Sequence, residues 1–225
     1  MDIDNTLLSQ ARRILTVISM VKNTPIDIEK VLNGSISLEK PLEYYKQMNE
    51  KEIRLFYSIF LSDMYYYDEE KKEYLVDPIP MSREILWALK KDGYRIFYVT
   101  ARIYNNIVKQ FDMTYKMLKD FDYPIEDKDM ELILMPNDYI PDSYEGFYSL
   151  AKKFKREVSK ELKAKYRAFI GIGDSSSDID AYNEAGIVSV QARFVIPEYK
   201  YYNKAKEAVY KWSDFLDIIE KYKNV

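Results

Sequence analysis

Apolar residues recur at helical spacing through the first third of the chain. Over residues 7–21 they fall three or four positions apart, the period of an amphipathic helix. The stretch over residues 37–64 predicts two more helices, and the second opens at Asn49 with Glu52 three residues later as its capping partner. We therefore expect residues 10–75 to be helical.

The pattern changes at residues 77–80, where Asp-Pro-Ile-Pro forms a stiff turn that ends the helical run. Helices then alternate with short apolar runs that are typical of buried strands. We expect helices over 82–91, 103–119, 149–164 and 178–185, and strands over 95–100, 131–135, 168–172 and 187–191. The alternation predicts an α/β fold, a Rossmann-like parallel sheet with helices on both faces, plus a small all-helical unit.

Composition narrows the chemistry that this fold could perform. The 225 residues include no histidine and no cysteine, which excludes imidazole bases, thiolate nucleophiles, disulfides and zinc fingers. The formal charge of −3 gives no overall basic field, so binding nucleic acid is disfavoured as a main task. No apolar run approaches the roughly 18 residues that span a bilayer, and we expect a cytoplasmic protein that does not bind membranes.

A parallel sheet binds its ligands at the carboxyl ends of its strands, and polar residues follow two of the expected strands. Thr100 ends the run RIFYVT, Asp174 follows AFIGIG, and Asp178 lies four residues further on, in the first turn of the next helix. Asp2 and Asp4 are two residues apart, on one side of an extended segment. Four carboxylates without histidine or thiol ligands suit a hard cation such as Mg²⁺.

Each of these signals also has a purely structural interpretation. Residues 4–6 (DNT) and residues 174–178 (DSSSD) could simply cap helices, because Asp, Asn, Ser and Thr favour that position. Thr100 could be a hydroxyl satisfied at a strand end. The order of the motifs favours the functional interpretation.

DIDNTL, YVTAR, a lysine-bearing helix and GDSSSD follow one another along the chain, and this order resembles the haloacid dehalogenase-like superfamily of phosphohydrolases. The resemblance extends in outline over residues 1–191, and GIGDSSSDIDAYNEAGI is its most specific part. It implies an α/β core of residues 1–9 and 76–225, and a helical cap of residues 10–75 that closes over the active site. The alternative for the insertion is a helical appendage used in oligomerisation.

The resemblance also implies residue roles. Asp2 would be the nucleophile and form an aspartyl-phosphate, while Asp4 would protonate the leaving oxygen and later deprotonate the attacking water. Mg²⁺ would be held by the Asp2 carboxylate, the Asp4 main-chain carbonyl and Asp174, and Asp178 would support the metal or orient a lysine. Thr100 and that lysine would hold the phosphoryl oxygens.

Four lysines lie on the helix expected over 149–164: Lys152, Lys153, Lys155 and Lys160. Lys155 neighbours the apolar face formed with Ala151, Val158 and Leu162, and its segment FKREV resembles the lysine segment of the family. We therefore prefer Lys155 to Lys153. The alternative is that all four lysines form a solvated basic face.

The implied function is a Mg²⁺-dependent phosphatase acting on a small phosphorylated metabolite. A phosphomutase would use the same residues. The segment GYRIFYVTAR also resembles phosphatases that act on polynucleotide ends, but the acidic net charge of the chain argues against a polynucleotide substrate. A further alternative is a catalytically impaired scaffold or binding protein, because only Met1 precedes Asp2 where the family has a buried apolar strand. Without that strand its neighbours would have unpaired backbone groups, so we expect the natural chain to begin upstream of Met1.

Aromatic residues are frequent in the insertion and could line a substrate pocket, although aromatics at this spacing are more often core. The candidates are Tyr44, Tyr45, Phe56, Tyr57, Tyr65, Tyr66 and Tyr67.

Overall fold

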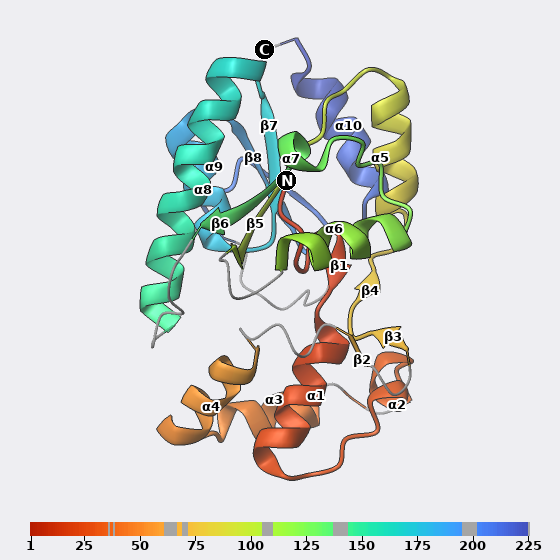
Figure 1. The fold of residues 1–225 in the computed structure, drawn as a ribbon, viewed down its shortest axis with the longest axis vertical. Coiled ribbons are helices and arrows are strands. Elements are labelled where there is room, and N and C mark those ends of the chain that lie inside the picture. Colours follow the sequence, from red (N-terminus) through yellow and green to blue (C-terminus); the bar gives the residue numbers. More distant parts are fainter. Residues whose placement is uncertain are drawn as a thin grey trace.

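The computed structural model describes residues 1–35, 37, 39–60, 67–68, 72–104, 110–136, 144–194 and 202–224. They form an α/β region and, below it in Figure 1, a group of helices. Within these residues no helix is both long and apolar enough to cross a membrane.

The α/β region contains two sets of parallel strands. β5 (Tyr98–Tyr104) pairs with β6 (Leu132–Pro136). β7 (Ile170–Gly173), β8 (Val188–Ala192) and β9 (Glu207–Val209) form a second sheet in that order. The expected parallel arrangement is confirmed.

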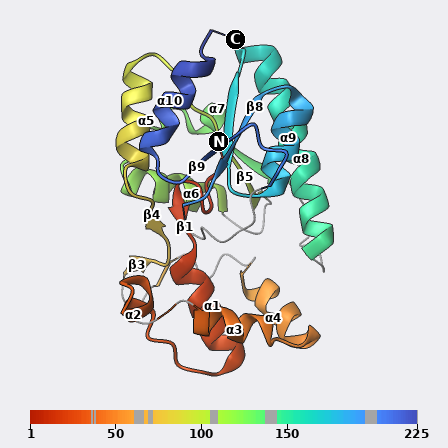
Figure 2. The same cartoon turned by 180° about the vertical axis from the view of Figure 1, so that it is seen from behind.

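Helices cover both faces of these strands. They are α5 (Ser82–Lys91), α6 (Gln110–Asp120), α7 (Lys128–Glu131), α8 (Tyr144–Tyr166), α9 (Ser176–Ala185) and α10 (Ser213–Tyr222). In Figure 1, α8 and α9 lie on one side of the strands and α5 and α10 lie on the other. The main apolar core lies between the strands and α5, α6 and α10, and Figure 2 shows α10 beside α5 from behind.

The first two residues join the two sheets. Val99 N donates to the Met1 carbonyl at 2.8 Å, and Asp2 N donates to the Ile172 carbonyl at 2.9 Å. The Met1 amino group also donates to the Phe97 carbonyl at 2.7 Å. These bonds place Met1 and Asp2 between β5 and β7, beside Val99 and Ile172. A cavity of about 310 Å³ is lined by Met1 and by residues of both sheets, among them Val99 and Ile172.

The lower helices pack around a small core of their own. They are α1 (Ala11–Lys22), α2 (Ile28–Leu32), α3 (Glu39–Lys46) and α4 (Glu50–Phe60). α1 packs against α4 around a cluster that includes Val17, Ile18, Met48 and Phe56. The expected capping pair is present, because the Asn49 N–H donates to Glu52 at 2.8 Å.

Several expected boundaries are wrong. The first helix begins at Ala11 and not at residue 7, because β1 (Leu8–Ser9) pairs with β4 (Asp77–Pro78). The region 10–75 is not wholly helical, since β2 (Tyr67–Asp68) and β3 (Glu73–Tyr74) form a hairpin. Part of the expected second helix, residues 61–64, lies outside the described residues.

The strand expected over 95–100 runs from Tyr98 to Tyr104. Its extension displaces the helix expected from residue 103, and the described part of that helix begins at Gln110. The strand continues because Ile103 and Tyr104 pair with the end of β6 after a register shift.

Candidate active site

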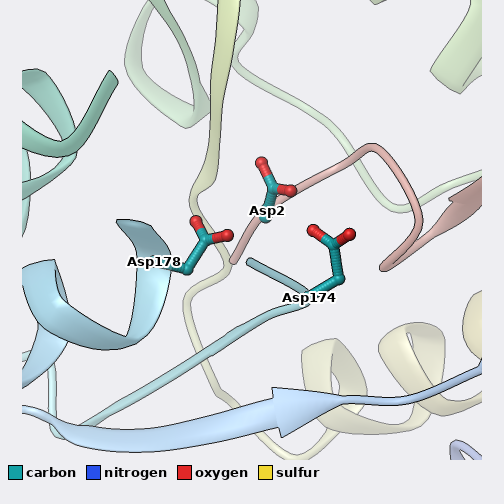
Figure 3. A group of neighbouring side chains, drawn as sticks. All are labelled: Asp2, Asp174 and Asp178. Atoms are coloured by element: carbon teal, nitrogen blue, oxygen red, sulfur yellow. The ribbon is translucent and has the colours of Figure 1, made fainter. Parts of the chain in front are cut away.

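Three carboxylates meet at the edge where the strands end. Asp2, Asp174 and Asp178 point toward one another in Figure 3, and each offers an oxygen within 4.8 Å of the others. Asp2 lies between the two sheets, Asp174 directly follows β7, and Asp178 is in the first turn of α9. Asp2 is 4% exposed and Asp178 is fully buried. The structure thus brings together three of the four carboxylates expected to meet there.

A helix cap fixes the position of Asp178. The Asp178 N–H donates to the Ser175 hydroxyl, and the Asp178 carboxylate accepts from the Ser175 N–H, which is a reciprocal capping arrangement. A Cβ at Gly173 would overlap the Asp178 side chain, so glycine allows the close approach of strand and helix. The cap interpretation of residues 174–178 is therefore confirmed, and it describes the same residues that form the acidic cluster.

Lys155 reaches this cluster from α8. Its Nζ donates to Asp2 Oδ1 at 3.0 Å and to Asp178 Oδ1 at 2.5 Å, and it is 4% exposed. Lys153 and Lys160 are exposed, and Lys152 pairs with Asp180. The geometry therefore separates Lys155 from the solvated lysines of the same helix.

The cluster carries more negative charge than Lys155 alone offsets. Burial raises the pKa of Asp2 to about 7, against the pull of Lys155. Burial, together with the charge of Asp2, raises the pKa of Asp174 well above its usual value. Burial lowers the pKa of Lys155, but the charges of Asp178 and Asp2 outweigh it and raise that pKa overall. Buried oxygens that repel one another in this way fit a hard divalent cation.

The Asp4 carboxylate is oriented by different partners. Arg102 Nε donates to Asp4 Oδ2 at 3.0 Å and Arg102 Nη2 donates to Asp4 Oδ1 at 2.6 Å. Gln10 Nε2 donates to Asp4 Oδ1 as well, and Thr114 Oγ1 accepts from Arg102 Nη1 at 3.1 Å. Burial alone would raise the pKa of Asp4, but Arg102 and, to a smaller extent, Arg13 and Lys155 together outweigh burial and lower it. The side chain of Asp4 thus lies outside the three-carboxylate group.

Arg102 was not among the residues singled out in the sequence. The sequence could have indicated Arg102, because it comes two residues after Thr100 in an extended segment and residues at that spacing point to the same face. Thr100 itself is 1% exposed, and its hydroxyl accepts from the Arg102 N–H at 3.3 Å.

A cavity of about 180 Å³ opens onto these groups. Its lining includes five of the six expected site residues: Asp2, Asp4, Thr100, Lys155 and Asp174. Asp178 reaches the site through its contact with Lys155.

The insertion also contributes to the wall of this cavity, through Gln10, Arg13 and Phe60. Arg13 is 2% exposed, and its guanidinium lies 4.4 Å from the Phe60 ring centroid. It donates to Gln10 Oε1 at 3.1 Å and to the Phe60 carbonyl. None of these residues was expected from the sequence, because their meeting depends on tertiary packing.

Most of the insertion's candidate aromatics belong to its own core. Tyr44, Tyr45 and Tyr57 pack against the cluster that contains Phe56. Tyr67 stacks edge-on against Tyr74. The core interpretation is confirmed for Tyr44, Tyr45, Phe56 and Tyr57, while Tyr65 and Tyr66 lie outside the described residues.

The segment after Asp2 is a tight loop that does not cap a helix. α1 begins at Ala11, after Gln10, so the cap interpretation of residues 4–6 is wrong. Asn5 has φ +54°, a left-handed conformation that asparagine tolerates better than most residues. Trp212 Nε1 donates to the Thr6 carbonyl at 3.0 Å, which ties this loop to the C-terminal part of the chain.

No family model matches the sequence, and no curated protein matches it significantly. Solved structures do match nearly the whole chain. A protein from Clostridium acetobutylicum described as a predicted phosphatase is 17% identical, with a TM-score of 0.55, over 98% of this chain and 96% of that one.

A haloacid dehalogenase-like family hydrolase from Streptococcus pneumoniae is 14% identical, with a TM-score of 0.52, over 97% of this chain and 95% of that one. At such identities the likeness concerns the fold, and a fold alone does not specify a reaction. The chain therefore has the fold of the haloacid dehalogenase-like hydrolases, as the order of its motifs indicated.

Proposed function

We propose that this protein is a cytoplasmic Mg²⁺-dependent phosphatase that hydrolyses a small phosphorylated metabolite through an aspartyl-phosphate on Asp2. The observation that carries the proposal is the buried group of Asp2, Asp174, Asp178 and Lys155 beside a cavity that also holds Asp4. The solved structures of phosphatases and hydrolases with the same fold support it.

The carboxylates of Asp2 and Asp174 and the main-chain carbonyl of Asp4, supported by Asp178, would hold Mg²⁺. The ion would offset the repulsion between the phosphate and the carboxylates. The donor set fits this ion because all three side chains offer carboxylate oxygens, with Asp2 and Asp178 buried and Asp174 partly buried, and histidine and cysteine are absent from the chain.

The chain's own groups divide the remaining work. An Asp2 oxygen attacks phosphorus and the ester oxygen leaves, taking a proton from Asp4. Asp4 then takes a proton from water as that water attacks the aspartyl-phosphate, which releases phosphate and restores Asp2. Lys155 and the Thr100 hydroxyl hold the transferred phosphoryl oxygens. Arg102 fixes the direction of the Asp4 carboxylate.

We further propose that residues 10–75 form a cap over a core of residues 1–9 and 76–225. The presence of Gln10, Arg13 and Phe60 in the cavity wall supports this role. A cap in this position would exclude water and select the alcohol part of the ester.

The test is the release of phosphate from p-nitrophenyl phosphate, with Mg²⁺ or with EDTA. We expect turnover that requires Mg²⁺ and that falls by at least about 1,000-fold in Asp2→Asn. Asp92→Asn makes the same chemical change at an exposed position and should keep wild-type turnover. Unchanged turnover in Asp2→Asn would remove the assigned nucleophile. Mg²⁺ binding without turnover on a broad panel of phosphate esters would favour a non-catalytic binding protein.

A further inference from the structure

One polar group in the cavity wall has no role in the chemistry described above. Gln110 begins the described part of α6, is 4% exposed and lines the cavity. Its side-chain oxygen Oε1 is buried and has no hydrogen-bond partner among the residues that the structure describes. Buried polar atoms in folded proteins are nearly always paired, since an unpaired one is costly. An unpaired acceptor in the wall of a ligand cavity therefore indicates a partner that arrives with the ligand.

The position of Gln110 relates it to one side of the reaction. Thr114 lies one helical turn further along α6, on the same face of the helix. The Thr114 hydroxyl bonds Arg102, and Arg102 holds Asp4. Because Asp4 would protonate the leaving oxygen, Gln110 lies on the side of the cavity that receives the alcohol part of the ester.

The charges of this wall narrow the choice of donor. An amide oxygen can accept from a hydroxyl or from an ammonium group. Arg13 and Arg102 both line the same cavity and are almost fully buried. Of the carboxylates in that lining, Asp4 is already paired with Arg102, and Asp2 and Asp174 would hold Mg²⁺, so an ammonium group would meet the arginine charges without a free carboxylate. A neutral hydroxyl is the donor that fits.

We propose that Gln110 is a specificity-determining residue that accepts a hydrogen bond from a hydroxyl of the substrate's alcohol part, so that the preferred substrates are phosphate monoesters of polyhydroxylated alcohols such as sugars or polyols. This inference rests on the proposed phosphatase function. Thr6 offers a useful contrast: its hydroxyl is also buried and unpaired within the described residues, but Thr6 is not part of the cavity lining, and no ligand role follows for it.

The experiment compares two esters that differ in their hydroxyl groups. Glycerol 3-phosphate carries two hydroxyls, and n-propyl phosphate carries none. We expect Gln110→Leu to lower the ratio of kcat/KM for glycerol 3-phosphate to kcat/KM for n-propyl phosphate by about 5- to 10-fold, the range of one hydrogen bond. Gln47→Leu makes the same change at an exposed position and should keep the wild-type ratio.

Thermal unfolding of the same variants separates a ligand role from a structural one. Since Gln110→Leu removes an unpaired buried acceptor, its Tm should equal or exceed that of the wild type. A lowered Tm together with an equal loss of kcat/KM on both esters would show that Gln110 supports the fold, and would overturn the inference. An unchanged ratio would overturn it as well.

The two proposals fail in different ways. If the wild type hydrolyses p-nitrophenyl phosphate but Gln110→Leu leaves the ratio unchanged, the inference about Gln110 fails and the phosphatase function stands. If the wild type hydrolyses none of these esters with Mg²⁺, the proposed function fails and the inference fails with it.

Discussion

Asp2 and Asp4 are two residues apart and have opposite electrostatic surroundings. Burial raises the pKa of Asp2 to about 7. At Asp4, burial acts in the same direction, but Arg102 with Arg13 and Lys155 outweighs it and lowers the pKa. Without ligands these directions oppose the assigned roles: a bound divalent cation would lower the pKa of Asp2 and favour the ionised nucleophile, and the negative charge of a bound phosphate ester would raise the pKa of Asp4 and favour the proton donor. At the scale of single residues, the balance between burial and neighbouring charges distinguishes the two aspartates: burial and Asp178 outweigh Lys155 at Asp2, whereas the cations led by Arg102 outweigh burial at Asp4.

Arg102 provides the first prediction. Arg102→Lys keeps the positive charge but cannot make two parallel N–H bonds to the Asp4 carboxylate. Asp4 would then be poorly aimed, and we expect kcat on p-nitrophenyl phosphate to fall by about 10- to 100-fold. Arg83→Lys, at an exposed position, is the matched control. A kcat for Arg102→Lys within about twofold of the wild type would show that the alignment of Asp4 does not matter.

At the scale of elements, the C-terminal helix α10 and the loop after Asp2 depend on each other. Trp212 at the start of α10 is fully buried, and its indole N–H bonds the Thr6 carbonyl. Tyr123 OH donates to the Leu7 carbonyl at 2.8 Å. Two buried side chains from distant parts of the chain thus hold the main chain of this loop.

Trp212→Phe tests this connection. The variant keeps an aromatic ring but leaves the buried Thr6 carbonyl without its donor, and we expect a loss of about 1–3 kcal/mol in the free energy of unfolding. Trp87→Phe is the control, because Trp87 makes a similar bond to the Asp122 carbonyl at 2.8 Å but is 42% exposed, so that water can replace the donor. Urea unfolding measures both variants. Equal losses would contradict the role assigned to burial.

The elements differ in how well the sequence predicts them. Helices with a clear apolar period were predicted, and 82–91 matches α5 in full. The two-residue strands β1, β2, β3 and β4 were not, because two residues have no period and their pairing depends on distant partners. β9 was missed as well, because its three residues are too few to show a strand period. α10 could have been found, since Phe215, Ile218 and Ile219 have helical spacing.

The residues of the site also differ in how well the sequence predicts them. Asp174 and Asp178 could be placed because they follow a predicted strand, whereas Asp2 and Lys155 were placed by the resemblance of DIDNTL and FKREV to the motifs of the family. The structure brings all four together. Gln110 was missed because the meaning of its side chain depends on a cavity built by other elements. The missing strand before Asp2 was expected to leave the backbone groups of its neighbours unpaired. The main chain of Met1 and Asp2 pairs with two of these groups, the Val99 N–H and the Ile172 carbonyl.

At the scale of the whole molecule, buried tyrosines link stability to alkaline pH. The chain has 22 tyrosines. Burial raises the pKa of Tyr123 to about 12 and the pKa values of Tyr98 and Tyr182 well above their usual value. The folded state therefore keeps these phenols protonated, whereas the unfolded chain ionises them near pH 10. The contribution of these buried phenols to the free energy of unfolding is fully present below pH 10 and is lost as pH rises toward 12 and beyond.

We therefore expect the free energy of unfolding, measured with urea, to be smaller at pH 11 than at pH 9. Tyr123→Phe should reduce this difference, because one of the phenols that ionise only on unfolding is gone. Tyr210→Phe, at a position that is 59% exposed, should leave the difference unchanged. A pH dependence that is the same in Tyr123→Phe and in the wild type would contradict the assignment.

The nucleophilic role of Asp2 is the central claim, and the covalent intermediate tests it most directly. The protein would be mixed with Mg²⁺ and p-nitrophenyl phosphate, quenched in acid during turnover, cleaved with pepsin and examined by mass spectrometry. We expect one phosphoryl group on the peptide that contains Asp2 in the wild type, and none in Asp2→Asn. Rapid phosphate release with that peptide unmodified, or with the phosphoryl group on another residue, would contradict the claim.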